Sequence, residues 1–244
     1  MKAILEELAP TGVLRAAINM SNFLLVTATD NAGNPDGVSP AIARAIAGKL
    51  GVKATLIPFK NPGDVADAAV LNEWDIGNIA AEPERAKTIQ FSPAYCEIQA
   101  TYLLPPGSTF TSPEQVDSAG TRIAVKNRAA YDLWLTDNLH AATLVKAESI
   151  DHSFELFRDQ QLDALAGLRP ALIKQQQLMP GSVLLEDSFT AVQQSIGCQP
   201  NKPHAREFLH AFVRDAIASG LIAELIDQYG VTGKLSVAPP ITDH

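Results

Sequence analysis

The sequence is poor in cysteine and has no long apolar run, and each shortage excludes a class of protein. Its 244 residues include two cysteines, Cys96 and Cys198, which lie far apart and match no metal-binding spacing. Zinc sites need four converging ligands and the five histidines are scattered, so neither a metal site nor a cofactor is expected. No apolar stretch approaches the roughly 20 residues that cross a bilayer, so a membrane-spanning helix is not expected either.

Positive charge is also in short supply. The chain has 19 Lys and Arg against 27 Asp and Glu, which gives a formal net charge of −8, whereas nucleic-acid-binding proteins usually carry clustered positive charge. Nucleic acid is therefore not expected as a partner. With 46% hydrophobic and 19% charged residues, the composition is that of a soluble globular protein, long enough for one large domain or two smaller ones.

Targeting and catalytic motifs are missing too. The first residues, MKAILEELAP, lack the continuous apolar core of a signal peptide, which leaves a cytoplasmic protein and a mature exported protein with an added Met as alternatives. No P-loop, GxGxxG, GxSxG or HExxH motif occurs. This weakens an enzymatic interpretation without excluding it.

The sequence does contain a regular alternation of strand-like and helical runs, which indicates an α/β protein with mostly parallel sheets flanked by helices. One helix, at 40–50, is well delimited, with Ser39 as the expected N-cap, Pro40 at the first helical position and Gly51 after the end. The alternation restarts after residue 108, so a second α/β unit is expected. Strands are predicted at 13–18, 53–59, 75–80, 122–125, 142–147, 164–167 and 183–186, an extended segment at 191–198, and further helices at 63–74, 130–138, 152–161, 169–179, 203–218 and 221–230.

Ligands of open α/β sheets collect beyond the carboxyl ends of the strands, where helix N-termini also favour anions. Three stretches follow predicted strands in this way: NMSNF at 19–23, AAEPER at 80–85 and KNRAAYD at 126–132. We therefore expect binding residues there. Arg85, two residues after a proline, is interpreted either as an anchor for an anion or as a solvated charge at a helix start.

With these stretches in view, the chain resembles a type II periplasmic solute-binding protein of the amino-acid-binding family, family 3. Such proteins are the receptor components of ABC uptake systems. The most specific match is EWDIGNIAAEPERAKTIQFSPAY, at 73–95, and GVLRAAIN, GVSPAIARAIAGKLGVKATLIPF and IAVKNRAAYDLWL agree in spacing. The resemblance covers about residues 12 to 231. It implies a periplasmic, monomeric binding protein that delivers a small solute to ABC permease membrane subunits.

The resemblance also implies a fold and a mechanism. Lobe one is expected at 1–98 and 194–244 and lobe two at 99–193, inserted and joined by two crossing hinge segments, with ligand binding closing the lobes. Cys96 and Cys198 then fall near each other at the hinge, where a disulfide and two buried thiols are the alternatives. The tail 234–244, with two prolines and no period, is expected to be a surface strap or disordered.

By the same resemblance, the arginine of the PERAK element, Arg85, pairs with the α-carboxylate of the ligand. Backbone groups around Asn78 and Ala80 complete the first-lobe side, although Ala80 stands where the family commonly has a hydroxyl. The first-lobe loop that faces the side chain of the ligand matches Asn19, Asn22 and Phe23, and Phe23 is equally well interpreted as core.

The second lobe departs from the family pattern. A Gly-Thr-Thr-like turn that caps the carboxylate is replaced here by Arg128, Ala129 and Ala130 after Lys126 and Asn127, a basic loop that binds the ligand or points to solvent.

The acidic residue that binds the α-ammonium falls on Leu168, followed by Arg169. A buried ammonium without a carboxylate partner is costly. We therefore expect a small carboxylate, an organic acid or an atypical amino acid, as the ligand. The alternatives are an enzyme like the cyclohexadienyl dehydratases, which share this fold, and a ligand-sensing module.

Overall fold

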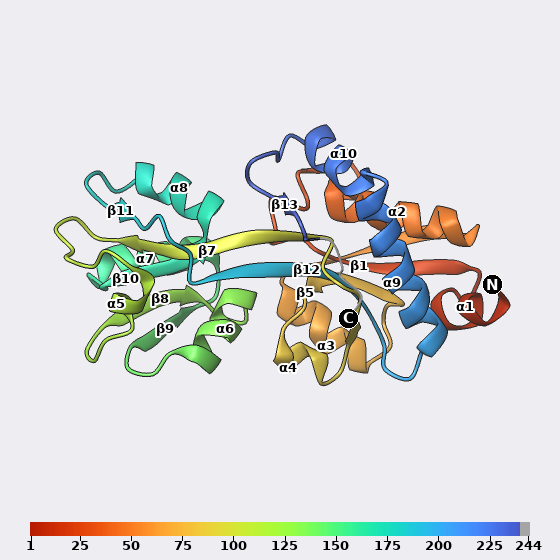
Figure 1. Ribbon diagram of the computed structural model, residues 1–244, viewed down its shortest axis with the longest axis horizontal. Coiled ribbons are helices and arrows are strands. Elements are labelled where there is room, and N and C mark those ends of the chain that lie inside the picture. The colour runs from red at the N-terminus through yellow and green to blue at the C-terminus, as the bar shows by residue number, and fades with distance from the viewer. Residues whose placement is uncertain (240–244) are drawn as a thin grey trace. The chain divides into compact units, whose positions relative to one another are not determined.

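The computed structural model describes residues 1–239, and the last part of the predicted tail, 240–244, lies outside the described residues. The chain divides into two compact units (Figure 1). Unit 1 comprises Met1–Glu97 together with the chain from Gln193 onward, and unit 2 comprises Ile98–Val192. Each unit is a mixed α/β structure, as the alternation of the sequence predicts.

Unit 1 is built on four neighbouring strands in the order β4-β1-β5-β12, in which β1 is parallel to β4 and β5, and β12 is antiparallel to β5. In Figure 1, α2 and α3 lie on opposite sides of these strands. The elements are α1 (Lys2–Leu8), β1 (Val13–Asn19), β2 (Ala28–Thr29), β3 (Pro35–Asp36), α2 (Val38–Leu50), β4 (Lys53–Phe59), α3 (Pro62–Val70), β5 (Ile76–Ala80), α4 (Pro83–Ala86), β6 (Gln90–Phe91), β12 (Thr190–Cys198), α9 (Pro203–Ala218), α10 (Leu221–Gln228) and β13 (Ser236–Val237).

Unit 2 has the strand order β7-β10-β8-β9, with β8 parallel to β9 and β10, and with β11 added antiparallel to β7. Strand β7 starts in unit 1, where Ser236 and Val237 of the tail pair with Glu97 and Cys96. The elements of unit 2 are β7 (Cys96–Leu104), α5 (Pro113–Val116), β8 (Arg122–Lys126), α6 (Ala130–Asn138), β9 (Thr143–Ala147), α7 (Ile150–Asp159), β10 (Ala164–Leu168), α8 (Arg169–Gln177) and β11 (Val183–Leu184).

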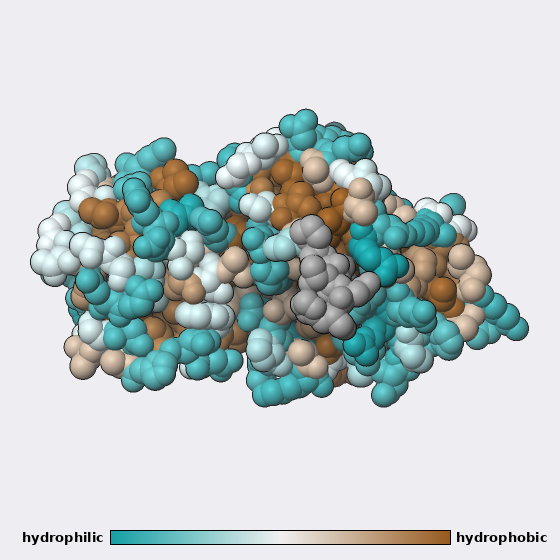
Figure 2. Space-filling view, viewed as in Figure 1, coloured by the Kyte–Doolittle hydropathy of each residue, from teal (hydrophilic) through white to brown (hydrophobic). Residues whose placement is uncertain are grey.

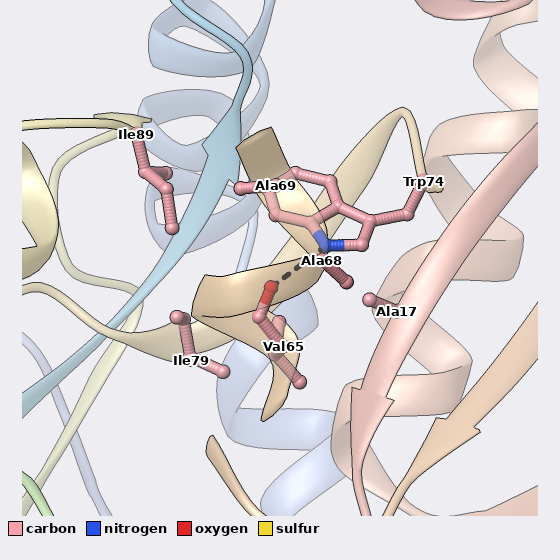
Figure 3. Packing of buried hydrophobic residues seen from close by; sticks show 7 residues of the cluster. All are labelled: Ala17, Val65, Ala68, Ala69, Trp74, Ile79 and Ile89. Carbon is pink, nitrogen blue, oxygen red and sulfur yellow. Dashed lines mark hydrogen bonds between the residues drawn. The ribbon is translucent and has the colours of Figure 1, made fainter. Parts of the chain in front are cut away.

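The core of unit 1 is organised around Trp74, which is completely buried. Its indole Nε1–H donates to the Val65 carbonyl at 2.9 Å, so the one polar group of the ring is satisfied (Figure 3). Gly77 lies against the ring, and a Cβ there would come within 3.1 Å of it. The cluster fixes α3 on the strands and comprises Ala17, Val65, Ala68, Ala69, Trp74, Ile79 and Ile89.

The core of unit 2 is a separate aliphatic and aromatic cluster. Phe154 and Phe157 of α7 pack against each other with ring centroids 6.4 Å apart, on a face that the 3.6-residue period of the helix puts inward. Ser149, before α7, accepts a hydrogen bond from the His152 amide and caps the helix. The cluster comprises Leu103, Ala124, Phe154, Phe157, Leu162, Leu165 and Leu172.

The start of α2 differs from the expectation. The helix begins at Val38, two residues early, and its N-cap is Gly37, with φ of 145°, so the prediction of Ser39 as N-cap is wrong. A Cβ at position 37 would lie 2.4 Å from the Leu25 carbonyl oxygen, so only glycine fits this close approach. The predicted end is confirmed, because Gly51 takes the left-handed conformation with φ of 72°.

Cys96 and Cys198 are buried free thiols, so the disulfide alternative is not realised in the structure. The register explains why. The Tyr95 amide donates to the Gln194 carbonyl, so Cys96, the next residue, lies beside the Gln194 end of β12. Cys198 is four residues further along this strand, which at ~3.3 Å per residue places it about 13 Å from Gln194. A disulfide needs Cα atoms within about 7 Å, so the expectation that the two cysteines are neighbours is wrong.

Polar side chains cover most of the face seen in Figure 2, and hydrophobic ones form smaller groups. Among residues 1–239, no helix combines the length and the apolar character of a membrane span.

Gly197 of β12 yields a test of the packing. A Cβ at this position would lie 2.4 Å from Cγ2 of the buried Ile89, so Gly197→Ala is expected to lower the free energy of unfolding by about 1–3 kcal/mol. Gly48→Ala is the matched control, since no atom lies within 4 Å of a Cβ there and alanine favours the helix. Urea unfolding measures both, and equal stability of the two variants would contradict the packing.

The cysteines yield a second test. Burial raises the pKa of Cys198 to about 11 and raises that of Cys96 further from its ordinary value, so both thiols are protonated at neutral pH. We expect no rapid reaction with a thiol reagent in the native protein and reaction of both thiols in concentrated guanidinium chloride. Recovery of fewer than two thiols after unfolding without reductant would show that a disulfide forms.

Candidate functional site

Arg85 is buried at the carboxyl edge of the unit 1 strands. Helix α4 starts with Pro83, whose fixed φ suits a first helical position, and Arg85 is its third residue. The side chain is only 4% exposed, and Nη1 donates to the carbonyl oxygen of Ala80, the last residue of β5, at 2.9 Å. The alternative interpretation of Arg85 as a solvated charge is therefore wrong.

The end of β5 is buried on all sides. Asn78 and Ala80 are 1% and 4% exposed, and their backbones pair with Ile196 and Gln194 of β12. The amide Nδ2 of Asn78 donates to the Ser39 carbonyl at 3.2 Å. The Ala80 carbonyl thus accepts from the Arg85 guanidinium, and Asn78 joins β5 to the start of α2.

The loop after β1 is shaped by its own asparagines. Oδ1 of Asn19 accepts from the amide and the hydroxyl of Ser21, at 3.2 and 2.8 Å. Oδ1 of Asn22, which is 7% exposed, accepts from the Leu24 amide. Phe23, which is partly buried, lies within the second of these Asx-type turns. Because β1 and β5 are parallel neighbours, this loop leaves the sheet at the same edge as β5.

The predicted basic loop of unit 2 is the turn between β8 and α6. Lys126, the last residue of β8, is 4% exposed, so the solvent-facing alternative is wrong for Lys126. Asn127 and Arg128 are exposed, whereas Ala129 and Ala130 are 5% and 7% exposed. The turn therefore combines one buried and one exposed cation.

An unforeseen carboxylate, that of Asp132, organises this turn. Asp132 is completely buried in the first turn of α6, and its Oδ2 accepts from the Arg128 amide at 2.7 Å. Lys146 Nζ lies 3.0 Å from its Oδ1. Arg128 adopts a left-handed backbone with φ of 59°, which this hydrogen bond holds in place. The sequence signal was an acid in the first turn of a predicted helix, the usual place for such a capping group.

Aromatic side chains fix α6 to the rest of unit 2. Trp134 of α6 packs on Phe189 with ring centroids 5.5 Å apart, and Phe189 packs on Tyr102 of β7 at 4.6 Å. The Phe189 amide also donates to the Ala100 carbonyl. The turn that carries Lys126 and Arg128 is therefore held by a rigid helix.

Leu168 and Arg169 connect β10 to α8. Leu168 is the partly buried N-cap residue of α8, and its aliphatic side chain offers no charge. Arg169 donates from Nε to Gln99 Oε1 at 2.8 Å and from Nη1 to the Leu185 carbonyl at 3.0 Å. Nη2 donates to the Glu186 carbonyl and to the Ser188 hydroxyl. These bonds bind the guanidinium to protein acceptors and hold the chain that follows β11.

Each unit thus presents cationic side chains beyond the carboxyl ends of its parallel strands: Arg85 in unit 1, and Lys126 and Arg128 in unit 2. A rigid guanidinium matches the geometry of a carboxylate or a phosphate. Within residues 1–239, no group of three or more His, Cys, Asp or Glu side chains is placed to hold a metal ion. The chemistry that the residues favour is recognition of a small anion.

Comparisons with known proteins agree with this description of the fold. Three solved structures that match are a mutant of ArgBP from T. maritima, the cysteine-binding protein from Campylobacter jejuni and the ancestral amino acid-binding protein AncCDT-1, a precursor of cyclohexadienyl dehydratase. Their identities are 20%, 18% and 20% and their TM-scores 0.73, 0.75 and 0.72. They cover 93%, 98% and 92% of this chain and 99%, 96% and 98% of their own.

No curated protein matches the chain. The structural likeness confirms the mixed α/β fold of the type II periplasmic binding proteins. The sequence profile of the bacterial extracellular solute-binding proteins, family 3, matches residues 14–232, nearly the whole chain. The protein therefore belongs to the family 3 bacterial extracellular solute-binding proteins.

Proposed function

We propose that this protein is the solute receptor of an ABC uptake system and binds a small carboxylate, an organic acid or an atypical amino acid. The observation that carries the proposal is the buried guanidinium of Arg85, fixed by the Ala80 carbonyl at the carboxyl edge of the unit 1 strands. A guanidinium is planar and can donate two parallel hydrogen bonds to a carboxylate, so a carboxylate ligand matches its geometry. Arg85 is the proposed carboxylate anchor.

Unit 2 supplies the second half of the proposed site. Lys126 and Arg128 add positive charge at the turn before α6, and the backbone of that turn is fixed by Asp132. The ligand is held from both units, which close on it as a hinge motion that its own contacts stabilise. Delivery is to the membrane subunits of an ABC permease, in the periplasm, and the receptor acts as a monomer.

The proposal of a carboxylate rather than a standard amino acid rests on Leu168. Several structural relatives carry amino acids in their names, such as the arginine-bound AbpA from Streptococcus pneumoniae and a lysine complex from Wolinella succinogenes. An α-ammonium group needs a carboxylate partner when it leaves water. At the position where the family offers one, this chain has an aliphatic side chain, and Arg169 beside it repels a cation.

The ligand class is tested by thermal shift and calorimetry against matched pairs, each an amino acid and the acid that lacks its amino group. We expect plain mono- and dicarboxylic acids to raise the melting temperature and to bind more tightly than their amino acid counterparts. Tight binding of a zwitterionic amino acid with no response to plain acids would overturn the carboxylate assignment. Native mass spectrometry of the purified protein identifies a co-purified acid, and conversion of that acid on incubation would favour the dehydratase-like alternative.

Variants of the two arginines test the roles of Arg85 and Arg169 separately. Arg85→Gln is expected to weaken ligand binding by about 2–5 kcal/mol, roughly 30-fold or more, and Arg85→Lys to lie between it and the native protein. Arg169→Ala is expected to lower the melting temperature, because its four hydrogen bonds within unit 2 are lost, and to leave the affinity close to native.

Arg214→Ala is the matched control, because Arg214 is an exposed arginine of α9. Circular dichroism of each variant separates a lost contact from a lost fold. Native affinity in folded Arg85→Gln would contradict the anchor role, and a large loss of affinity in folded Arg169→Ala would place Arg169 in the site.

A further inference from the structure

The last described segment of the chain forms a strand that lies outside the family match. The family profile ends at residue 232, whereas β13 follows it and pairs antiparallel with Cys96 and Glu97 at the start of β7 (Figure 1). The Ala238 amide, directly after β13, donates to the Tyr95 carbonyl at 3.1 Å. This added strand supplies no residue to the proposed ligand contacts, so its place in the fold needs a separate explanation.

Buried side chains on both sides of β13 fix it to unit 1. Leu235, just before the strand, and Ala238, just after it, are each 4% exposed. The Leu235 amide donates to the carbonyl of Val231 at 3.1 Å, and Val231 is itself buried after the end of α10. Burial of apolar side chains adds to the backbone hydrogen bonds of the strand. β13 is therefore an integral part of unit 1.

The position of β13 along the chain it pairs with is the informative feature. The chain passes between the two units at two places, from Glu97 to Ile98 and from Val192 to Gln193. Each passage falls inside a strand, the first in β7 and the second in β12. A motion of one unit against the other has to change backbone dihedrals near these passages. β13 pairs with the two residues of β7 that come immediately before the first passage.

The pairing partners of β7 leave a short gap at this passage. β10 and β11 together pair with Ala100–Leu104, and β13 pairs with Cys96 and Glu97. In the part of the chain that the structure describes, Ile98 and Gln99 are thus the two residues of β7 that have no partner in β10, β11 or β13. Residues outside such ladders change φ and ψ at a lower cost than residues inside them.

Side-chain hydrogen bonds divide β7 at the same point. Oε2 of Glu97 accepts from Nε2 of Gln193 at 2.7 Å, and both residues belong to unit 1. Oε1 of Gln99 accepts from Nε of Arg169 at 2.8 Å, and both residues belong to unit 2. Ile98 lies between them in the sequence. The residue before Ile98 is therefore held by unit 1 and the residue after it by unit 2.

We propose that β13 is a strap that confines the bending of β7 to Ile98 and Gln99, an inference that rests on the hinge motion of the proposed function. While β13 is paired, the chain up to Glu97 moves with unit 1. Without β13, Cys96 and Glu97 lose these partners, and the bending segment grows from two residues to four, Cys96 to Gln99. A shorter pivot gives the ligand-free protein fewer conformations, so less conformational entropy is lost when a ligand orders it.

Two proline variants of the full chain separate the pairing of β13 from other effects of a substitution. Neighbouring amides of a strand point in opposite directions, so the Val237 amide points away from β7 while the Ala238 amide donates to Tyr95. Ala238→Pro removes this donor. Val237→Pro is the matched control, because it introduces the same ring next to it and leaves the hydrogen bonds to β7 in place.

Electron–electron double resonance between two spin labels measures the spread of distances between the units. The labels are attached through Arg214→Cys in α9 and Asp137→Cys in α6, two exposed positions, while the buried native cysteines stay unlabelled. Without ligand, we expect a broader distance distribution in Ala238→Pro than in the native protein, and the native width in Val237→Pro. Equal widths in all three proteins, or equal broadening in both proline variants, would overturn the strap.

A pair of shortened chains repeats the comparison without proline. A chain that ends after Leu235 lacks β13, whereas a chain that ends after Pro239 keeps it. We expect broadening in the first chain alone, with circular dichroism showing that both are folded, and a native width in the first would contradict the strap. Because no ligand is present, these results decide the role of β13 separately from the carboxylate assignment, which thermal shift and calorimetry decide.

Discussion

The hydrogen bond from Arg85 to the Ala80 carbonyl is the interaction on which the unit 1 site depends. It places a permanent charge, 4% exposed, at the end of a strand whose own polar groups are paired. Such a charge is stable only if the surrounding dipoles are fixed before it is buried. The pairing of β5 with β12 fixes the Ala80 carbonyl, and the Asn78 hydrogen bond to the Ser39 carbonyl holds β5 against the start of α2.

In unit 2 the buried charge is negative rather than positive. Here a buried carboxylate, Asp132, holds a turn whose nearby cations include Arg128 and Lys146. The protein supplies its own anion at the start of α6, so the backbone of the turn does not depend on a ligand for its shape. A turn that is fixed in advance loses less conformational entropy when a ligand binds.

Local signals located most of the helices and strands, and tertiary contacts decided the rest. The period of apolar residues predicted most helices and strands, and Pro83 marked the start of the short helix that carries Arg85. The N-cap of α2 was mispredicted because Gly37 approaches the Leu25 carbonyl, a contact 12 residues away in sequence. The closeness of the two cysteines was mispredicted because the register of β12 cannot be deduced from the residues around each cysteine. Arg169 binds acceptors 16 to 19 residues downstream, which no pattern around it indicates.

The overall charge of the chain limits how a carboxylate can be recognised. A net charge of −8 repels anions at long range, so electrostatic steering does not favour their approach. At physiological ionic strength this repulsion is screened beyond about 8 Å, and the ligand then meets only nearby charges. In the proposed site, the buried cations Arg85 and Lys126 act at this short range, where little water is present and charge-assisted hydrogen bonds are strong. Selectivity for an anion on an acidic protein therefore has to come from desolvated contacts, which is consistent with cations placed at strand ends rather than on the surface.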